Sequence, residues 1–65
     1  MPIITVQANQ LSLETRRELV HELTQSAARI MGLPPETIVV VLECRPAEDY
    51  AVGGVLLADR HREGS

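Results

Sequence analysis

The order of apolar and polar positions along the chain predicts a strand, a long helix and a second strand. Residues 3–8 are rich in β-branched side chains, which favour extended structure. They place Ile4, Val6 and Ala8 on one side of an extended backbone, because side chains alternate between the two faces of a strand. We therefore expect a strand that begins almost at the first residue and has one apolar face.

The next segment carries the clearest pattern, that of a helix of roughly 20 residues, about 30 Å long. Ser12 is a good N-cap, and Glu14 lies in the first turn, where a carboxylate suits the helix dipole. Apolar side chains then recur at helical spacing, at Leu19, Val20, Leu23, Ala27, Ile30 and Met31. Gly32 stands at the expected C′ position, and Pro34 and Pro35 prevent the helix from resuming.

A second strand is expected in residues 37–43, which contain five consecutive apolar residues without alternation. Such an unbroken run is typical of a strand that is covered on both faces, as in parallel sheets. The order strand, helix, strand then predicts a right-handed β-α-β unit with parallel strands.

Beyond the second strand the pattern is weaker. A polar loop leads to Gly53 and Gly54, which favour a turn, and the apolar residues 55–57 predict a further short strand or hairpin arm. We expect about residues 59–65 to form a frayed tail, because they are charged and end in Gly-Ser. Residues 1–65 as a whole are predicted to be a single α/β domain.

The small size of the chain predicts association with further copies. A chain of 65 residues buries only about 60% of its unfolded surface and is marginally stable alone. The chain has a single cysteine, Cys44, so it cannot form an internal disulfide. Cys44, His21 and His61 are too few for a structural zinc site, which needs about four ligands, and no metal or cofactor is expected. One helix covers one face of a two-stranded sheet, and a second copy is the simplest cover for the other. We therefore expect a homo-oligomer.

Charge and composition exclude several classes of partner. The formal net charge is −3, the six positive residues are arginines scattered along the chain, and Tyr50 is the single aromatic residue. These features disfavour a nucleic acid or an anionic membrane as partner. No apolar run approaches the roughly 20 residues that span a bilayer, and the N-terminus lacks a signal-peptide pattern, so a cytoplasmic protein is expected.

Pro2 is the most informative candidate for chemistry. A small residue at position 2 normally allows Met1 to be removed, which would leave Pro2 with a free secondary amine. Beside Ile3, Ile4 and an apolar strand this amine would be desolvated, and desolvation lowers the pKa of an amine because it disfavours the charged form. A neutral amine is a usable general base near pH 7. The alternative interpretation is a proline that only sets the start of an edge strand.

Several motifs occur together along the chain. They are Pro2-Ile3, Ser12-x-Glu14 at the helix start, Leu19-Val20-x-Glu22, the strand at residues 37–43, and Tyr50-Ala51-Val52-Gly53-Gly54. On these residues the chain resembles the 4-oxalocrotonate tautomerase family of the tautomerase superfamily. The resemblance implies short β-α-β subunits that assemble as a hexamer, a trimer of dimers. It also implies an isomerase in which Pro2 is the catalytic base and the substrate is a small 2-oxo or 2-hydroxy unsaturated carboxylic acid.

The sequence departs from the family at the arginines that bind substrate. The family places one arginine in the loop after the first strand, a position that falls here at Leu11 or in a one-residue deletion around residues 9–11, and one in the second strand, where this chain has Val39. Arg45, just beyond the second strand, is the best internal replacement, and the alternative is a solvated loop arginine. Tyr50 stands at the family's aromatic position, where a ring keeps the proline pocket apolar. The sequence leaves open whether its hydroxyl also donates to a substrate oxygen or the ring only packs.

Two other functions stay open at this point. The chain would suit a non-catalytic partner subunit of a hetero-oligomeric tautomerase-like assembly, because it lacks both family arginines. It would also suit a hydratase or dehalogenase of the same superfamily, in which Glu43 activates water.

Overall fold

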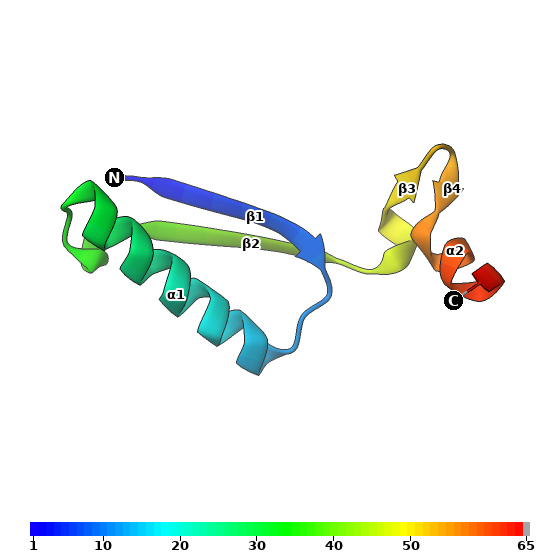
Figure 1. Cartoon of the computed structure of the whole chain (residues 1–65), viewed down its shortest axis with the longest axis horizontal. Coiled ribbons are helices and arrows are strands. Elements are labelled where there is room, and N and C mark those ends of the chain that lie inside the picture. The colour runs from blue at the N-terminus through cyan, green and yellow to red at the C-terminus, as the bar shows by residue number, and fades with distance from the viewer. Residues whose placement is uncertain (65) are drawn as a thin grey trace.

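The computed structural model of the chain describes residues 1–64, and the side chains of residues 1–60. A parallel two-stranded sheet and one long helix form a β-α-β unit, from which a small hairpin and a second helix extend (Figure 1). The strands are β1 (Ile3–Asn9), β2 (Val39–Arg45), β3 (Ala51–Val52) and β4 (Val55–Leu56). The helices are α1 (Leu13–Met31) and α2 (Leu57–Gly64), with short 3₁₀ turns at Pro35–Thr37 and Ala47–Asp49. The predicted α/β fold with parallel strands and a C-terminal hairpin is confirmed.

Both ends of α1 are capped as the sequence predicts. The Ser12 hydroxyl oxygen accepts a hydrogen bond from the Thr15 backbone N–H at 3.1 Å, which satisfies one of the free donors of the first turn. At the other end Gly32 has a φ of 70°, and its N–H donates to the Ala28 carbonyl oxygen at 2.9 Å. Glycine adopts this left-handed conformation without steric cost, so it ends the helix. Within the described residues no helix is both long and apolar enough to cross a bilayer.

Strand β2 begins and ends two residues later than the sequence predicts. Thr37 is withdrawn from the strand by a 3₁₀ turn, in which its backbone N–H and its hydroxyl both donate to the Pro34 carbonyl oxygen, at 3.0 and 2.7 Å. At the other end the pairing with β1 continues as far as Asn9 and Arg45. Arg45 therefore belongs to the strand and not to the loop that follows it.

The hairpin β3–β4 is built around two glycines. Gly53 and Gly54 have φ values of 62° and 83°, and positive φ at both central residues is what a two-residue hairpin turn of type I′ requires. The Leu57 backbone N–H closes the hairpin by donating to the Tyr50 carbonyl oxygen at 2.9 Å. The hairpin and α2 lie beyond the ends of β1 and β2, as an arm on the long axis of the molecule (Figure 1).

The C-terminal segment forms a short helix after the hairpin. The sequence predicts a frayed tail from about residue 59, whereas the backbone is helical from Leu57 to Gly64, and Ser65 lies outside the described residues. Arg60 ties this helix to the hairpin, because its Nη2 donates to the Val52 carbonyl oxygen at 2.9 Å. Asp59 lies in the first turn, where a carboxylate suits the helix dipole. Asp59 and Arg60, the charged residues of this helix whose side chains are described, are both exposed.

Helix α1 covers one face of the sheet and leaves the other face bare (Figure 1). The strand residues that face the helix are half-buried: Ile4, Val6, Ala8, Val40, Leu42 and Cys44. The uncovered face carries Ile3, Thr5, Gln7, Val39, Val41, Glu43 and Arg45. On that face Ile3 is 60% exposed and Val41 is 38% exposed, so the predicted burial of both faces of the second strand is not achieved within one chain.

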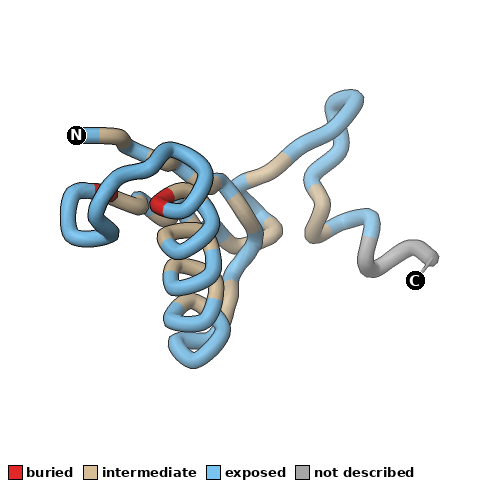
Figure 2. The backbone as a smooth tube through the Cα atoms, turned by 60° about the vertical axis from the view of Figure 1, so that its left-hand side comes forward, coloured by how far each residue is buried: buried red, intermediate tan, exposed pale blue. Residues whose placement is uncertain are grey.

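The isolated chain has very little buried interior (Figure 2). Among the residues whose side chains are described, Ala28 and Ile38 alone are buried apolar residues. The radius of gyration is 15.5 Å, whereas a compact chain of this length would have about 11 Å. The accessible surface is 4983 Å², against about 4,100 Å² for a compact monomer of this mass. An extended shape without a closed core favours association with other subunits.

Candidate active site

Pro2 lies at the head of the parallel sheet, directly before β1. It is half-buried, and its carbonyl oxygen accepts a hydrogen bond from the Val39 backbone N–H at 3.0 Å, which ties it to the start of β2. The preceding Met1 is 86% exposed. While Met1 is attached, the Pro2 nitrogen belongs to an amide and has no basic lone pair. Removal of this exposed residue would convert it into a secondary amine.

Neither position at which the family carries an arginine offers a positive charge here. Val39 pairs with Ile3 at the Pro2 end of the sheet and is half-buried on the uncovered face. Leu11 is half-buried in the loop after β1, and its carbonyl oxygen accepts a hydrogen bond from Arg16 Nε at 3.1 Å. Arg16 therefore stabilises the turn into α1. The sequence alone does not predict this role, because it places Arg16 only on a polar face of the helix.

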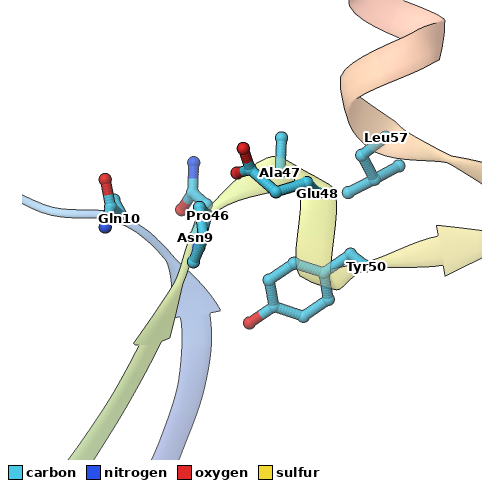
Figure 3. Close-up of a pocket in the computed structure, with 7 residues that line it drawn as sticks. All are labelled: Asn9, Gln10, Pro46, Ala47, Glu48, Tyr50 and Leu57. Carbon is cyan, nitrogen blue, oxygen red and sulfur yellow. The ribbon is translucent and has the colours of Figure 1, made fainter.

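A hollow of about 470 Å³ lies at the opposite end of the sheet, between the end of β1, the turn after β2 and the start of α2 (Figure 3). It is lined by Asn9, Gln10, Pro46, Ala47, Glu48, Tyr50 and Leu57. The half-buried Tyr50 donates its hydroxyl hydrogen to the Ala8 carbonyl oxygen at 2.7 Å. A phenol has one hydrogen to donate, so in this arrangement the Tyr50 hydroxyl positions the ring and does not act as a donor toward a ligand.

Arg45 projects from the same end of the sheet, on its uncovered face. Its Nη1 lies 3.3 Å from Asp49 Oδ2, and the two side chains are 62% and 39% exposed. A contact this exposed stabilises the fold very little, so its main effect is to orient the guanidinium. The sequence alone does not identify Asp49 as a site residue. Its spacing of four residues from Arg45 is a signal that the two side chains can form an ion pair where the chain turns tightly.

Glu43 lies two residues before Arg45 on the same face. Its Oε1 accepts a hydrogen bond from Gln7 Nε2 at 2.9 Å, across the pairing of β2 with β1. Glu43 is exposed, and the one hydrogen bond that its side chain makes within the described residues is the one from Gln7. The sequence gives no warning of the Gln7 contact, because it depends on the register of the two strands.

The structure separates the three candidate residues into two groups. Arg45 and Tyr50 lie at one end of the sheet, and Pro2 lies at the other. The strand between them has seven residues, and six steps of about 3.3 Å make a separation of about 20 Å. No side chain bridges that distance, so one chain alone does not assemble the predicted site.

Comparison with known proteins agrees with this architecture. The family described as tautomerase enzyme matches residues 2–60. A probable tautomerase of Staphylococcus epidermidis is 39% identical over 61 residues, which are 92% of this chain and 100% of the relative. A probable tautomerase of Listeria monocytogenes serotype 4b is 37% identical over 60 residues, which are 91% of this chain and 98% of the relative.

Solved structures support the same assignment. TomN, a 4-oxalocrotonate tautomerase homologue in the tomaymycin biosynthetic pathway, superposes with a TM-score of 0.90 at 32% identity, over 98% of this chain and 100% of that one. DmpI from Archaeoglobus fulgidus superposes with a TM-score of 0.80 at 38% identity, over 89% of this chain and 100% of that one. The parallel β-α-β unit, the family match that begins at Pro2 and the full-length relatives agree, and the chain belongs to the tautomerase family.

Proposed function

We propose that this chain is an isomerase that moves a proton between the enol and keto forms of a small 2-oxo or 2-hydroxy unsaturated acid. The Pro2 amine, freed by removal of Met1, is the general base. The observation that carries the proposal is the placement of Pro2, half-buried at the head of the sheet and tied to Val39. The names of the relatives, probable tautomerases, support the reaction class.

The chemistry needs a base, a stabiliser of negative charge and a shield from water. A neutral Pro2 amine takes the proton from the enol hydroxyl or from a carbon beside the carbonyl, and returns it to another carbon of the same molecule. Negative charge builds on the oxygen during transfer, and a positively charged or hydrogen-bonding group near it lowers the barrier. In this proposal Arg45 supplies the positive charge and the Tyr50 ring excludes water.

Because Pro2 and Arg45 lie about 20 Å apart in one chain, we propose that the site forms between copies. A two-fold axis that sets two sheets antiparallel places the start of each strand beside the end of the partner's strands. The Pro2 amine of one copy then lies near Arg45 and Tyr50 of the other. The bare sheet face, the free strand edges and the projecting arm supply surface for this contact and for assembly into a homo-hexamer.

The deciding experiment compares three preparations whose intact masses are verified: processed wild type, Pro2→Ala, and protein that retains Met1. Ketonisation of phenylenolpyruvate should be at least tenfold slower in Pro2→Ala and roughly 100-fold slower or more when Met1 blocks the amine, since a positioned base contributes about 10²–10⁴-fold. The rate of the processed protein should rise with pH as the amine loses its proton. Sedimentation should show the same oligomer in all three.

Equal rates in the three preparations would refute catalysis by Pro2. The same result, together with a second short chain that co-purifies with the native protein, would favour the non-catalytic partner subunit instead. A hydratase would be recognised by addition of water to an unsaturated acid and by loss of that reaction in Glu43→Gln.

A further inference from the structure

The arginines of the chain differ in whether their guanidinium groups are already engaged in hydrogen bonds to the backbone. Five of the six arginines have described side chains. Arg16 donates to the Leu11 carbonyl oxygen at 3.1 Å, and Arg60 donates to the Val52 carbonyl oxygen at 2.9 Å, so both are engaged in holding the backbone. Two more lie on exposed positions of α1. Arg45 is the one arginine carried by the strands of the sheet.

The contact with Asp49 leaves most of the Arg45 guanidinium open. Asp49 Oδ2 accepts a hydrogen bond from Arg45 Nη1 at 3.3 Å, and within the described residues no other hydrogen bond or ion pair engages this side chain. The edge formed by Nε and Nη2 is therefore free, and such an edge matches the two oxygens of a carboxylate in a bidentate pair. With Nη1 held, the guanidinium loses less conformational freedom when it binds a carboxylate.

The surroundings of Arg45 are otherwise negative. Glu43 lies on the same sheet face, Asp49 contacts the guanidinium, and Glu48 lines the hollow beside Tyr50. One positive and three negative groups leave this end of the sheet with a net charge of −2, counted from these four side chains. One carboxylate can pair with Arg45, whereas a second would face like charge without a partner.

We infer that the tautomerase site accepts enols or unsaturated acids that carry one carboxylate, which Arg45 binds while Asp49 orients it. This inference rests on the proposed function. Arg45 contacts the substrate, and Asp49 is a positioning residue that acts through Arg45. The remainder of the substrate is expected to carry no further negative charge, since the hollow that begins at Pro46, next to Arg45 in the chain, is lined by Glu48 as well as by the apolar surface of Tyr50 and Leu57.

The substrate class is tested with two enols that differ in charge. Phenylenolpyruvate carries one carboxylate and 2-hydroxymuconate carries two, and kcat/KM should be at least tenfold higher for the first. Glu48→Gln removes a negative charge from the hollow and should narrow this ratio by several-fold. A preference of the wild type for 2-hydroxymuconate, or no effect of Glu48→Gln on the ratio, would overturn the assignment of substrate class.

The roles of the two side chains are tested by the split between KM and kcat. Arg45→Gln should raise KM for phenylenolpyruvate about 10- to 100-fold, the range of a hydrogen bond to a charged group, and should also lower kcat, because Arg45 supplies the positive charge in the proposed reaction. Arg17→Gln removes the same charge from an exposed position on α1 and should leave both constants unchanged. Asp49→Asn should raise KM several-fold, but not in the Arg45→Gln background, because its effect passes through Arg45.

The outcomes separate this inference from the proposed function. If Pro2→Ala abolishes activity but Arg45→Gln leaves KM unchanged, the proposed function stands and this inference is overturned. Additive effects of Asp49→Asn and Arg45→Gln would overturn the positioning role. If the processed wild type converts neither enol, the proposed function fails and this inference fails with it. Sedimentation of each variant checks that the wild-type oligomer is retained, because Arg45 lies on the sheet face that the proposed subunit contact uses.

Discussion

Two inactive variants should restore each other's activity if the site is shared between copies. Pro2→Ala removes the base, and Arg45→Gln removes the substrate contact about 20 Å away at the other end of the sheet. Each variant alone should be slow at substrate concentrations below KM. A mixture that is unfolded together and refolded forms pairs that contain one copy of each variant. In such a mixed pair one of the two sites carries both substitutions and the other carries neither.

The size of the recovery follows from this geometry. In an equal mixture about half of the two-fold pairs are mixed, and one site of each mixed pair is intact. About one quarter of all sites should therefore have wild-type composition, and kcat/KM for phenylenolpyruvate should reach about one quarter of the wild-type value. The assay is the rate of ketonisation at low substrate, with sedimentation to show that the refolded mixture is oligomeric. Each variant refolded separately is the control.

The result that would refute this reasoning is a refolded mixture whose rate equals the average of the two variants. A site contained within one chain gives that result, because every chain then carries one of the two substitutions. The proposed arrangement of Pro2 and Arg45 would be wrong even if each residue proved essential by itself.

Three further substitutions test other parts of the structure. Tyr50→Phe should lower the free energy of unfolding by about 1 kcal/mol, because it removes the hydrogen bond to the Ala8 carbonyl oxygen. It should leave kcat within about threefold. A decrease in kcat of about 100-fold would show that the hydroxyl donates to substrate instead. Val39→Arg should raise kcat/KM for 2-hydroxymuconate, mainly through a lower KM, because it adds a guanidinium beside Pro2. An unchanged KM in a folded variant would show that this position faces away from the substrate. Ser12→Ala should destabilise the protein by about 1 kcal/mol in denaturant unfolding, through loss of the hydrogen bond from the Thr15 N–H, while the rates with both enols stay the same; an unchanged midpoint would argue that this cap contributes nothing.

Local features of the chain were predictable because their causes are local. The hydroxyl of Ser12 and the conformational freedom of Gly32 act within one turn of α1, so the ends of that helix follow from the sequence. The alternation of Ile4, Val6 and Ala8 selects the face of β1 that the helix covers, and the order strand, helix, strand then requires parallel pairing. The chemical candidate Pro2 was also visible, since its position in the chain decides whether a free amine can arise.

Only the tertiary structure decided where the candidate residues lie relative to one another. The sequence places Pro2 and Arg45 43 positions apart, and only the parallel register of β1 with β2 shows that they lie at opposite ends of one sheet. The hydrogen bond that occupies the Tyr50 hydroxyl depends on how the turn after β2 folds back toward Ala8. Such contacts join segments far apart in sequence, so their geometry depends on the packing of the whole chain and not on local preference. The apolar run of the second strand predicts association with other subunits from the sequence alone, whereas only the structure shows which sheet face one chain leaves uncovered.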